Sequence, residues 1–148
     1  MFNAIKHEEE KLLTVDEGKQ IANEAATWDE TDYAKAGTEY AGPNAEKGIA
    51  GDCSGINHAV HETTGHDYPY QTASEFTKTS GGGHFAKVDV PQIGDTVAWK
   101  GHLGIYAGNG MMWTTHLHSN NAEYGSDKIK SFSDDFGKNP DYYRYRKQ

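Results

Sequence analysis

The chain has one cysteine, Cys53, which lies in the segment Gly51-Asp52-Cys53-Ser54-Gly55. This segment ends an irregular stretch and precedes a helical pattern, so we expect Cys53 at the start of a helix. The free N–H groups and the positive dipole end of a helix start favour a thiolate. The same N–H groups can hold the oxyanion that forms when a thiolate attacks a carbonyl. A buried cysteine that packs as a small apolar side chain is the alternative, and the local residues leave both interpretations open.

A nucleophilic thiol needs a base within hydrogen-bond distance, and the sequence offers eight histidines. His58 and His61 follow Cys53 in the same predicted helix, more than one and more than two turns away, so we expect them to pack or to face solvent. His102 follows Gly101 and begins an apolar run. That position places an imidazole at a sheet edge, where a helix N-terminus can meet it. His102 is therefore the predicted general base.

The segment Gly108-Asn109-Gly110 predicts a hairpin turn between two apolar strands. With a three-residue loop, His102 falls opposite His116 on one face, and Thr114 and His118 become diagonal neighbours. His116 can then orient the ring of His102 as a third catalytic group. A two-residue loop would place His102 on the other face, and a solvent-facing strand edge is the competing interpretation for the two later histidines.

Helix and strand signals follow one another in two blocks. Thr14 and Glu17 form a predicted capping box that opens a helix to about residue 28, preceded by a loose lead-in at residues 1–13. A second capping box, at Thr72 and Glu75, opens a short helix. The remaining predicted elements are a helix over 53–64 and strands over 96–99, 103–107, 111–115 and 142–146. Residues 29–51 are predicted to be an irregular loop. Helices followed by an antiparallel sheet indicate the α+β class in a single domain, 1–148.

Composition excludes several classes of protein. The 148 residues carry a net charge of −8, which is unfavourable for nucleic-acid binding. No apolar run is long enough to span a membrane. A single cysteine excludes an internal disulfide and four-thiolate zinc sites. The first residues lack the basic and apolar regions of a secretory signal. We therefore expect synthesis in the cytoplasm and, where the protein leaves the cell, a route that does not use such a signal.

Three motifs, taken together and in this order, resemble the NlpC/p60 family of papain-like cysteine peptidases and amidases of bacterial cell walls. They are Asp52-Cys53-Ser54-Gly55, then Pro91 with Gly94-Asp95-Thr96-Val97-Ala98-Trp99, then the run from His102 to Gly110. Upstream, Gly37-Thr38-Glu39-Tyr40 resembles the family segment before the nucleophile, with Glu39 where proline is usual. The resemblance spans roughly residues 21 to 116.

The resemblance implies a papain-like NlpC/p60 fold in which N-terminal helices pack on a C-terminal antiparallel sheet. It implies Cys53 as the nucleophile and His102 as the general base, with Tyr40 and Ser54 at the oxyanion and substrate pocket. The third polar residue of the family usually lies twelve positions after the histidine, which is Thr114 here. Because threonine is a poor acceptor for orienting the ring, His116 is the expected substitute, with His118 behind it.

The family implies cleavage of peptidoglycan stem peptides, typically between D-glutamate and the following diamino acid, without metal or cofactor. A small acidic catalytic domain without a signal also resembles the amidase effectors of type VI secretion systems. Such an effector would act in the periplasm of target bacteria, and an immunity protein would block it in the producer. We expect a monomer with no membrane partner. A domain cut from a larger wall hydrolase or phage lysin would look the same.

Three other functions stay open. A thiol acyltransferase of related fold would need an apolar channel, whereas the residues from Thr72 to Gly83 are polar. A zinc site would combine Cys53 with one of the helix histidines and with His102, His116 or His118. A binding domain without catalysis could keep the fold, but intact Cys53 and His102 argue against it.

Overall fold

The structure is a computed structural model that describes residues 12–115 and 123–147. Its helices are α2 (Val15–Ala26), α3 (Cys53–Thr63), α4 (Ala73–Thr79) and α5 (Ile129–Phe136), with a 3₁₀ turn at Gly42–Asn44. The short strands β1 (Asp32–Tyr33) and β2 (Ala50–Gly51) form a parallel pair. The main sheet contains β3 (Phe85–Val88), β4 (Thr96–Trp99), β5 (His102–Gly108), β6 (Met111–Thr115), β7 (Tyr124–Lys128) and β8 (Asp141–Tyr145).

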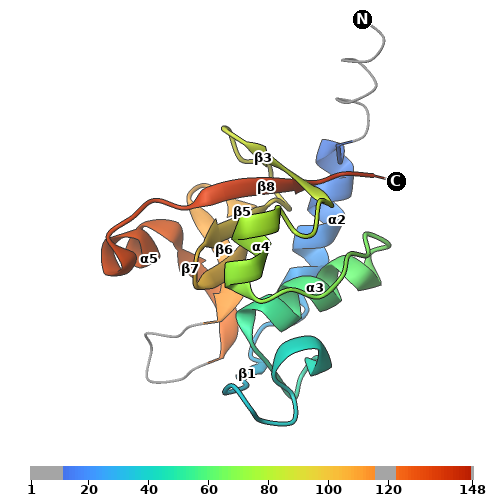
Figure 1. The fold of residues 1–148 in the computed structure, drawn as a ribbon, viewed down its shortest axis with the longest axis vertical. Coiled ribbons are helices and arrows are strands. Elements are labelled where there is room, and N and C mark those ends of the chain that lie inside the picture. The colour runs from blue at the N-terminus through green and yellow to red at the C-terminus, as the bar shows by residue number, and fades with distance from the viewer. Residues whose placement is uncertain (1–11, 116–122, 148) are drawn as a thin grey trace, which may run out of the picture.

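The main sheet has the strand order β3-β8-β4-β5-β6-β7, and every neighbouring pair is antiparallel. Helices α2, α3 and α4 cover one face, whereas α5 packs on the other (Figure 1). The chain is therefore an α+β protein, as the sequence predicted. Within the described residues, no helix combines the length and the apolar character that crossing a membrane requires.

Two apolar clusters, one on each face, hold the sheet. All four residues of β4 are buried, because Ala98 packs into the cluster beneath α2, α3 and α4 while Val97 and Trp99 pack with α5. Alternate residues of a strand point to opposite faces. The end of β4 and the start of β5 are thus enclosed from both sides, which gives the region around His102 a rigid setting.

Both predicted capping boxes are present. Thr14 and Glu17 open α2, and Thr72 and Glu75 open α4, with reciprocal side-chain and backbone hydrogen bonds in each. The predicted loose lead-in is wrong at its end. Leu13 is only 5% exposed within the core, and Leu12 pairs with Arg146 as an isolated β-bridge. Burial of apolar area holds these residues in place.

The turn between β5 and β6 has two residues instead of three. Asn109 and Gly110 both have positive φ angles, 54° and 74°, as a tight hairpin turn requires. A bulge between Tyr106 and Gly108 then shifts the register by one residue, so that Tyr106 pairs with Met112. The bulge restores the register that the three-residue loop predicted, and Thr114 therefore lies on the same face as His102.

Candidate active site

Asp52 begins α3 and fixes the loop in front of it. Its carboxylate accepts hydrogen bonds from the N–H of Gly55, at 2.8 Å, and from the N–H of Gly42, at 2.9 Å. The loop carbonyl of Gly42 lies so close to Gly55 that a side chain at position 55 would collide with it. The motif around Cys53 thus contains the helix cap and the small residue that let the loop approach the start of α3.

Cys53 is the first residue of α3 and is half-buried. Burial, with a smaller contribution from the charge of Asp52, raises the pKa of its thiol to about 11. Backbone hydrogen bonds from Leu103, Ser54 and Cys53 itself act in the opposite direction. In the absence of substrate the thiol is therefore protonated at neutral pH, and a base must take its proton during a reaction.

His102 is the first residue of β5 and is fully buried. Its Nε2 lies 2.7 Å from the hydroxyl of Thr114, which donates its own proton to the carbonyl of Leu103 at 2.9 Å. Because a threonine hydroxyl has one proton, the Thr114 oxygen must accept from Nε2–H. The proton on Nε2 leaves Nδ1 of the neutral ring with the lone pair that a general base needs.

Aromatic rings fix the orientation of His102. Its ring stacks on Phe132 of α5, with centroids 4.7 Å apart and planes 17° apart. The rings of Trp99 and Phe136 also lie near the His102 ring, with centroids 6.1 Å and 5.9 Å from its centroid. Stacking on one side and a hydrogen bond at Nε2 together restrict rotation of the imidazole.

Cys53 lies against the start of β5, the strand that His102 opens. The backbone N–H of Leu103, the residue directly after His102, is directed at the Cys53 sulfur. Helix α3 also packs along β5, the strand that His102 opens. The arrangement combines a thiol at a helix N-terminus, an oriented imidazole on the adjoining strand and converging backbone N–H groups, which are the parts that acyl transfer by a cysteine requires.

Solved structures share this arrangement of helices and strands. NlpC1 from Trichomonas vaginalis matches 88% of this chain with a TM-score of 0.62 and 16% identity, and the chain spans 43% of that protein. The NlpC/p60 domain of the peptidoglycan hydrolase SagA matches 86% of the chain with a TM-score of 0.58 and 22% identity, over 97% of that domain. The P60 domain of an antigen from Mycobacterium avium subspecies paratuberculosis gives a TM-score of 0.59 at 14% identity, over 88% of this chain and 94% of that domain. The chain has the NlpC/p60 fold.

At the level of sequence, no protein-family model and no curated protein matches this chain. The likeness to the NlpC/p60 structures therefore lies in the backbone arrangement.

Two residues that the resemblance placed at the oxyanion and substrate pocket occupy different settings. The Ser54 hydroxyl lies 2.9 Å from the Tyr70 hydroxyl and 3.3 Å from the Asp52 carboxylate, so these two groups engage it. Its backbone N–H, not its side chain, faces the sulfur of Cys53. Tyr40 is half-buried and lies two residues before Gly42, in the loop that approaches α3. Its role in the oxyanion pocket stays a prediction.

Thr114, twelve positions after His102, is the residue that hydrogen-bonds to the His102 ring. The prediction preferred His116, with His118 behind it. Both lie outside the described residues, so their contribution stays a prediction.

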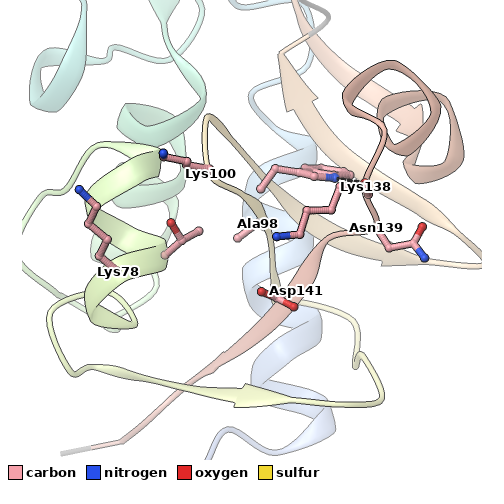
Figure 2. A pocket seen from close by; sticks show the side chains of 8 residues that line it. Lys78, Ala98, Lys100, Lys138, Asn139 and Asp141 are labelled. Atoms are coloured by element: carbon pink, nitrogen blue, oxygen red, sulfur yellow. Dashed lines mark hydrogen bonds between the residues drawn. The ribbon is translucent and has the colours of Figure 1, made fainter.

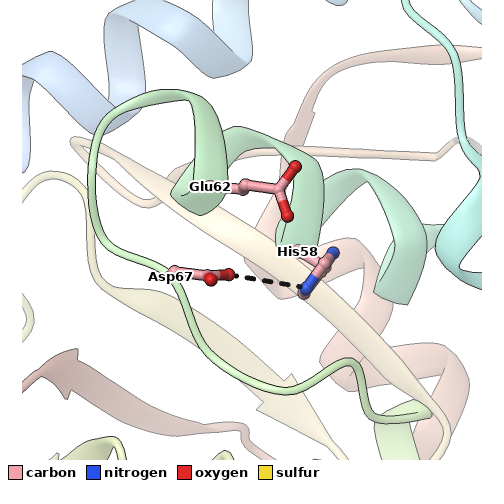
Figure 3. Close-up of side chains that lie close together, drawn as sticks. All are labelled: His58, Glu62 and Asp67. Atoms are coloured by element: carbon pink, nitrogen blue, oxygen red, sulfur yellow. Dashed lines mark ion pairs between the residues drawn. The ribbon is translucent and has the colours of Figure 1, made fainter.

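A group of side chains that could hold a metal ion lies on α3 and the segment after it. His58, Glu62 and Asp67 place one ligand atom each within 4.8 Å of one another, and His58 Nε2 lies 4.0 Å from the Asp67 carboxylate (Figure 3). The group does not include Cys53. Among the described residues, the predicted alternative of a zinc site built on Cys53 therefore has no set of ligands.

Sequence reasoning treated Tyr68 and Tyr70 as core residues that could line a groove, and it did not predict that four tyrosines gather around the thiol. Burial raises the pKa of four phenols, and the charge of a Cys53 thiolate raises each of them further, which places them near the sulfur: Tyr33, Tyr68, Tyr70 and Tyr124. They come from β1, from the segment after α3 and from β7, and no local pattern links those segments. Phe132 was also missed, although Ile129, Phe132 and Phe136 follow a helical spacing that could have revealed α5.

Proposed function

We propose that this protein is a cysteine peptidase or amidase that hydrolyses the peptide part of peptidoglycan. The observation that carries the proposal is the meeting of Cys53, at the start of α3, with the strand end that holds the oriented ring of His102. The name of SagA as a peptidoglycan hydrolase supports the choice of substrate, because SagA contains the same fold.

The reaction begins when a substrate carbonyl reaches Cys53 and Nδ1 of His102 takes the thiol proton. The sulfur then attacks the carbonyl carbon, and the N–H groups at the start of α3 stabilise the oxyanion. His102 returns the proton to the departing amine, which leaves an acyl group on Cys53. Water, deprotonated by the same ring, attacks the thioester and regenerates the thiol. Tyr40 would add its phenol to the oxyanion pocket.

The bond that we propose is the one between D-glutamate and the diamino acid of the stem peptide. The test is to digest purified peptidoglycan with the wild type, Cys53→Ala, His102→Ala and a control, His84→Gln, which changes a histidine away from the site. Mass spectrometry of the soluble fragments identifies the bond. We expect the same fragments from the wild type and the control, and none from the other two variants.

The absence of released fragments would contradict the proposed hydrolysis. If folded wild-type protein with an alkylatable thiol releases nothing from walls of several chemotypes, the proposed hydrolysis is wrong. A thiol acyltransferase would then be the function to test, with acyl thioesters as donors.

The biological role that we propose is that of an antibacterial effector that reaches the periplasm of target cells by a signal-independent route and is blocked in the producer by an immunity protein. This role depends on the proposed activity, because a wall hydrolase harms a cell only where it meets the wall. Expression in a Gram-negative host should cause Cys53-dependent lysis when the protein is directed to the periplasm. It should be harmless in the cytoplasm. Lysis from both compartments, or from neither, would contradict this role.

A further inference from the structure

A cavity of about 260 Å³ opens at the end of the sheet where β4 finishes and β8 begins. Three of its lining side chains are lysines from three separate parts of the chain (Figure 2): Lys78 on α4, Lys100 in the turn after β4 and Lys138 in the segment before β8. Thr77, Trp99 and Asp141 also contribute to its wall.

The charge of this cavity is opposite to that of the whole molecule. The chain has 22 acidic and 14 basic residues and a net charge of −8. One carboxylate lines the cavity, that of Asp141, and it lies 3.4 Å from Lys87. Glu75, on the same helix as Lys78, is held by the backbone N–H of Thr72 at 3.0 Å. Among the described residues, no ion pair within 4.0 Å involves any of the three lysines of the cavity.

Trp99 connects the cavity to the proposed base, since it lines the cavity and packs on the ring of His102. The Trp99 indole donates to the Lys138 carbonyl at 2.8 Å, which fixes the segment that carries one of the lysines. The Trp99 ring also packs against the ring of His102. A second hollow, of about 200 Å³, shares Trp99, Lys100 and Lys138 and extends to Phe136, which packs on His102 as well. Lys100 and Gly101 form the turn directly before the base.

We propose that this cavity, with Lys78, Lys100 and Lys138, is a subsite for the free carboxylates of the peptide substrate. The inference rests on the proposed function. An acidic stem peptide carries carboxylates on D-glutamate and on diaminopimelate, and amidation neutralises both. Exposed ammonium groups attract such carboxylates through solvent, more strongly at low salt. The protein therefore selects acidic over amidated stem peptides, and the cationic cavity attracts substrate despite the negative charge of the molecule.

The experiment measures binding separately from cleavage. Cys53→Ala protein is titrated with a tetrapeptide, L-Ala-γ-D-Glu-diaminopimelate-D-Ala, and with the same peptide amidated on D-glutamate and diaminopimelate. We expect the acidic peptide to bind about tenfold more tightly, a difference of the size that several exposed ion pairs can supply. Adding Lys78→Gln, Lys100→Gln and Lys138→Gln should remove the difference, and so should 0.5 M salt.

The matched control removes three exposed lysines elsewhere on the surface, through Lys19→Gln, Lys128→Gln and Lys130→Gln. It makes the same change in net charge and should keep the preference. Equal affinity for the two peptides, absence of binding, or equal effects of the two triple variants would overturn the subsite. Cleavage by the corresponding proteins with intact Cys53 is measured in parallel. Lysine-dependent binding without cleavage would overturn the hydrolysis alone, and cleavage with no dependence on the three lysines would overturn the subsite alone.

Discussion

The one hydroxyl proton of Thr114 determines which nitrogen of His102 can act as a base. That proton is donated to the Leu103 carbonyl, so the hydroxyl oxygen accepts from Nε2 and the lone pair lies on Nδ1. Threonine is uncharged and stabilises an imidazolium less than a carboxylate would. Its contribution is to select the tautomer and hold the ring.

Thr114→Val should therefore lower kcat on a stem peptide while the protein remains folded. Valine has nearly the same shape but no oxygen, so Nε2–H is left without this acceptor. We expect a loss of about tenfold or more, smaller than the about 10⁴-fold loss that follows replacement of the carboxylate in a serine triad. Thr114→Ser should retain most of the activity. A valine variant with full kcat would show that another group, such as His116, orients the ring.

The raised pKa of Cys53 predicts how the free thiol reacts. Since burial raises that pKa to about 11, the reactive thiolate is scarce at pH 7 and its fraction grows as the pH rises. The rate of alkylation by iodoacetamide should therefore increase about tenfold per pH unit and level off only near pH 11. Cys53 is the only cysteine, so Cys53→Ser is a complete control. A plateau near neutral pH would instead indicate a resting thiolate–imidazolium pair.

At the scale of elements, a buried ion pair ties the turn before β4 to β8. The Arg144 guanidinium donates two hydrogen bonds of 2.9 Å to the Asp95 carboxylate, which also accepts from the N–H of Gln92 at 2.7 Å. Burial raises the pKa of Asp95, although Arg144 and the Gln92 N–H act to lower it. The pair thus holds the start of β4 beside the last residues of β8.

Arg144→Ala should destabilise the fold by about 3 kcal/mol, because it leaves the buried Asp95 carboxylate without its cation. The measurement is the free energy of unfolding in urea. Lys130→Ala is the control, since it removes an exposed pair with Asp134 on α5 and should cost less than about 0.5 kcal/mol. Equal losses in the two variants would mean that the Asp95 pair contributes no more than a surface pair.

Helices with capping signals and strands with apolar runs were predictable from the sequence, whereas strands without an apolar run were not. Capping boxes predicted α2 and α4, and the change from an irregular stretch to a helical pattern predicted α3. In contrast, β7 reads Tyr-Gly-Ser-Asp-Lys, which has little intrinsic preference for a strand, and it forms because it pairs along β6. At the candidate site, local sequence predicted Cys53 at a helix start and His102 at a strand start, whereas long-range contacts bring Phe132 and Tyr124 to them.

At the scale of the whole molecule, helices cover both faces of the sheet, and some titratable side chains are buried between the helices and the sheet. His61 of α3 is fully buried among aromatic rings, including those of Tyr68 and Phe85. Burial lowers its pKa to about 4, although a hydrogen bond between Nδ1 and the Asn57 carbonyl acts to raise it. The core that supports α3, and with it Cys53, is therefore built around a neutral imidazole.

Acid should weaken the fold through this residue. Above about pH 6.5 His61 is neutral in both folded and unfolded chains, and the stability associated with its lowered pKa is fully present. Between about pH 6.5 and 4 the unfolded chain binds a proton that the folded chain does not, so stability falls as the pH falls. The total loss is about 3 kcal/mol, from a lowering of the pKa by roughly 2.5 units.

His61→Phe keeps a ring in the core and removes the titration. The free energy of unfolding in urea, measured from pH 7 to 4.5, should fall more steeply for the wild type than for this variant, because all other titrating groups are common to both. If the variant does not fold, NMR titration of the His61 ring protons in the wild type gives the same answer. The chemical shifts of these His61 ring protons should stay constant as the pH is lowered to about 5. Parallel stability curves, or a ring that titrates near pH 6.5 in the folded protein, would show that His61 takes up a proton without opening the core.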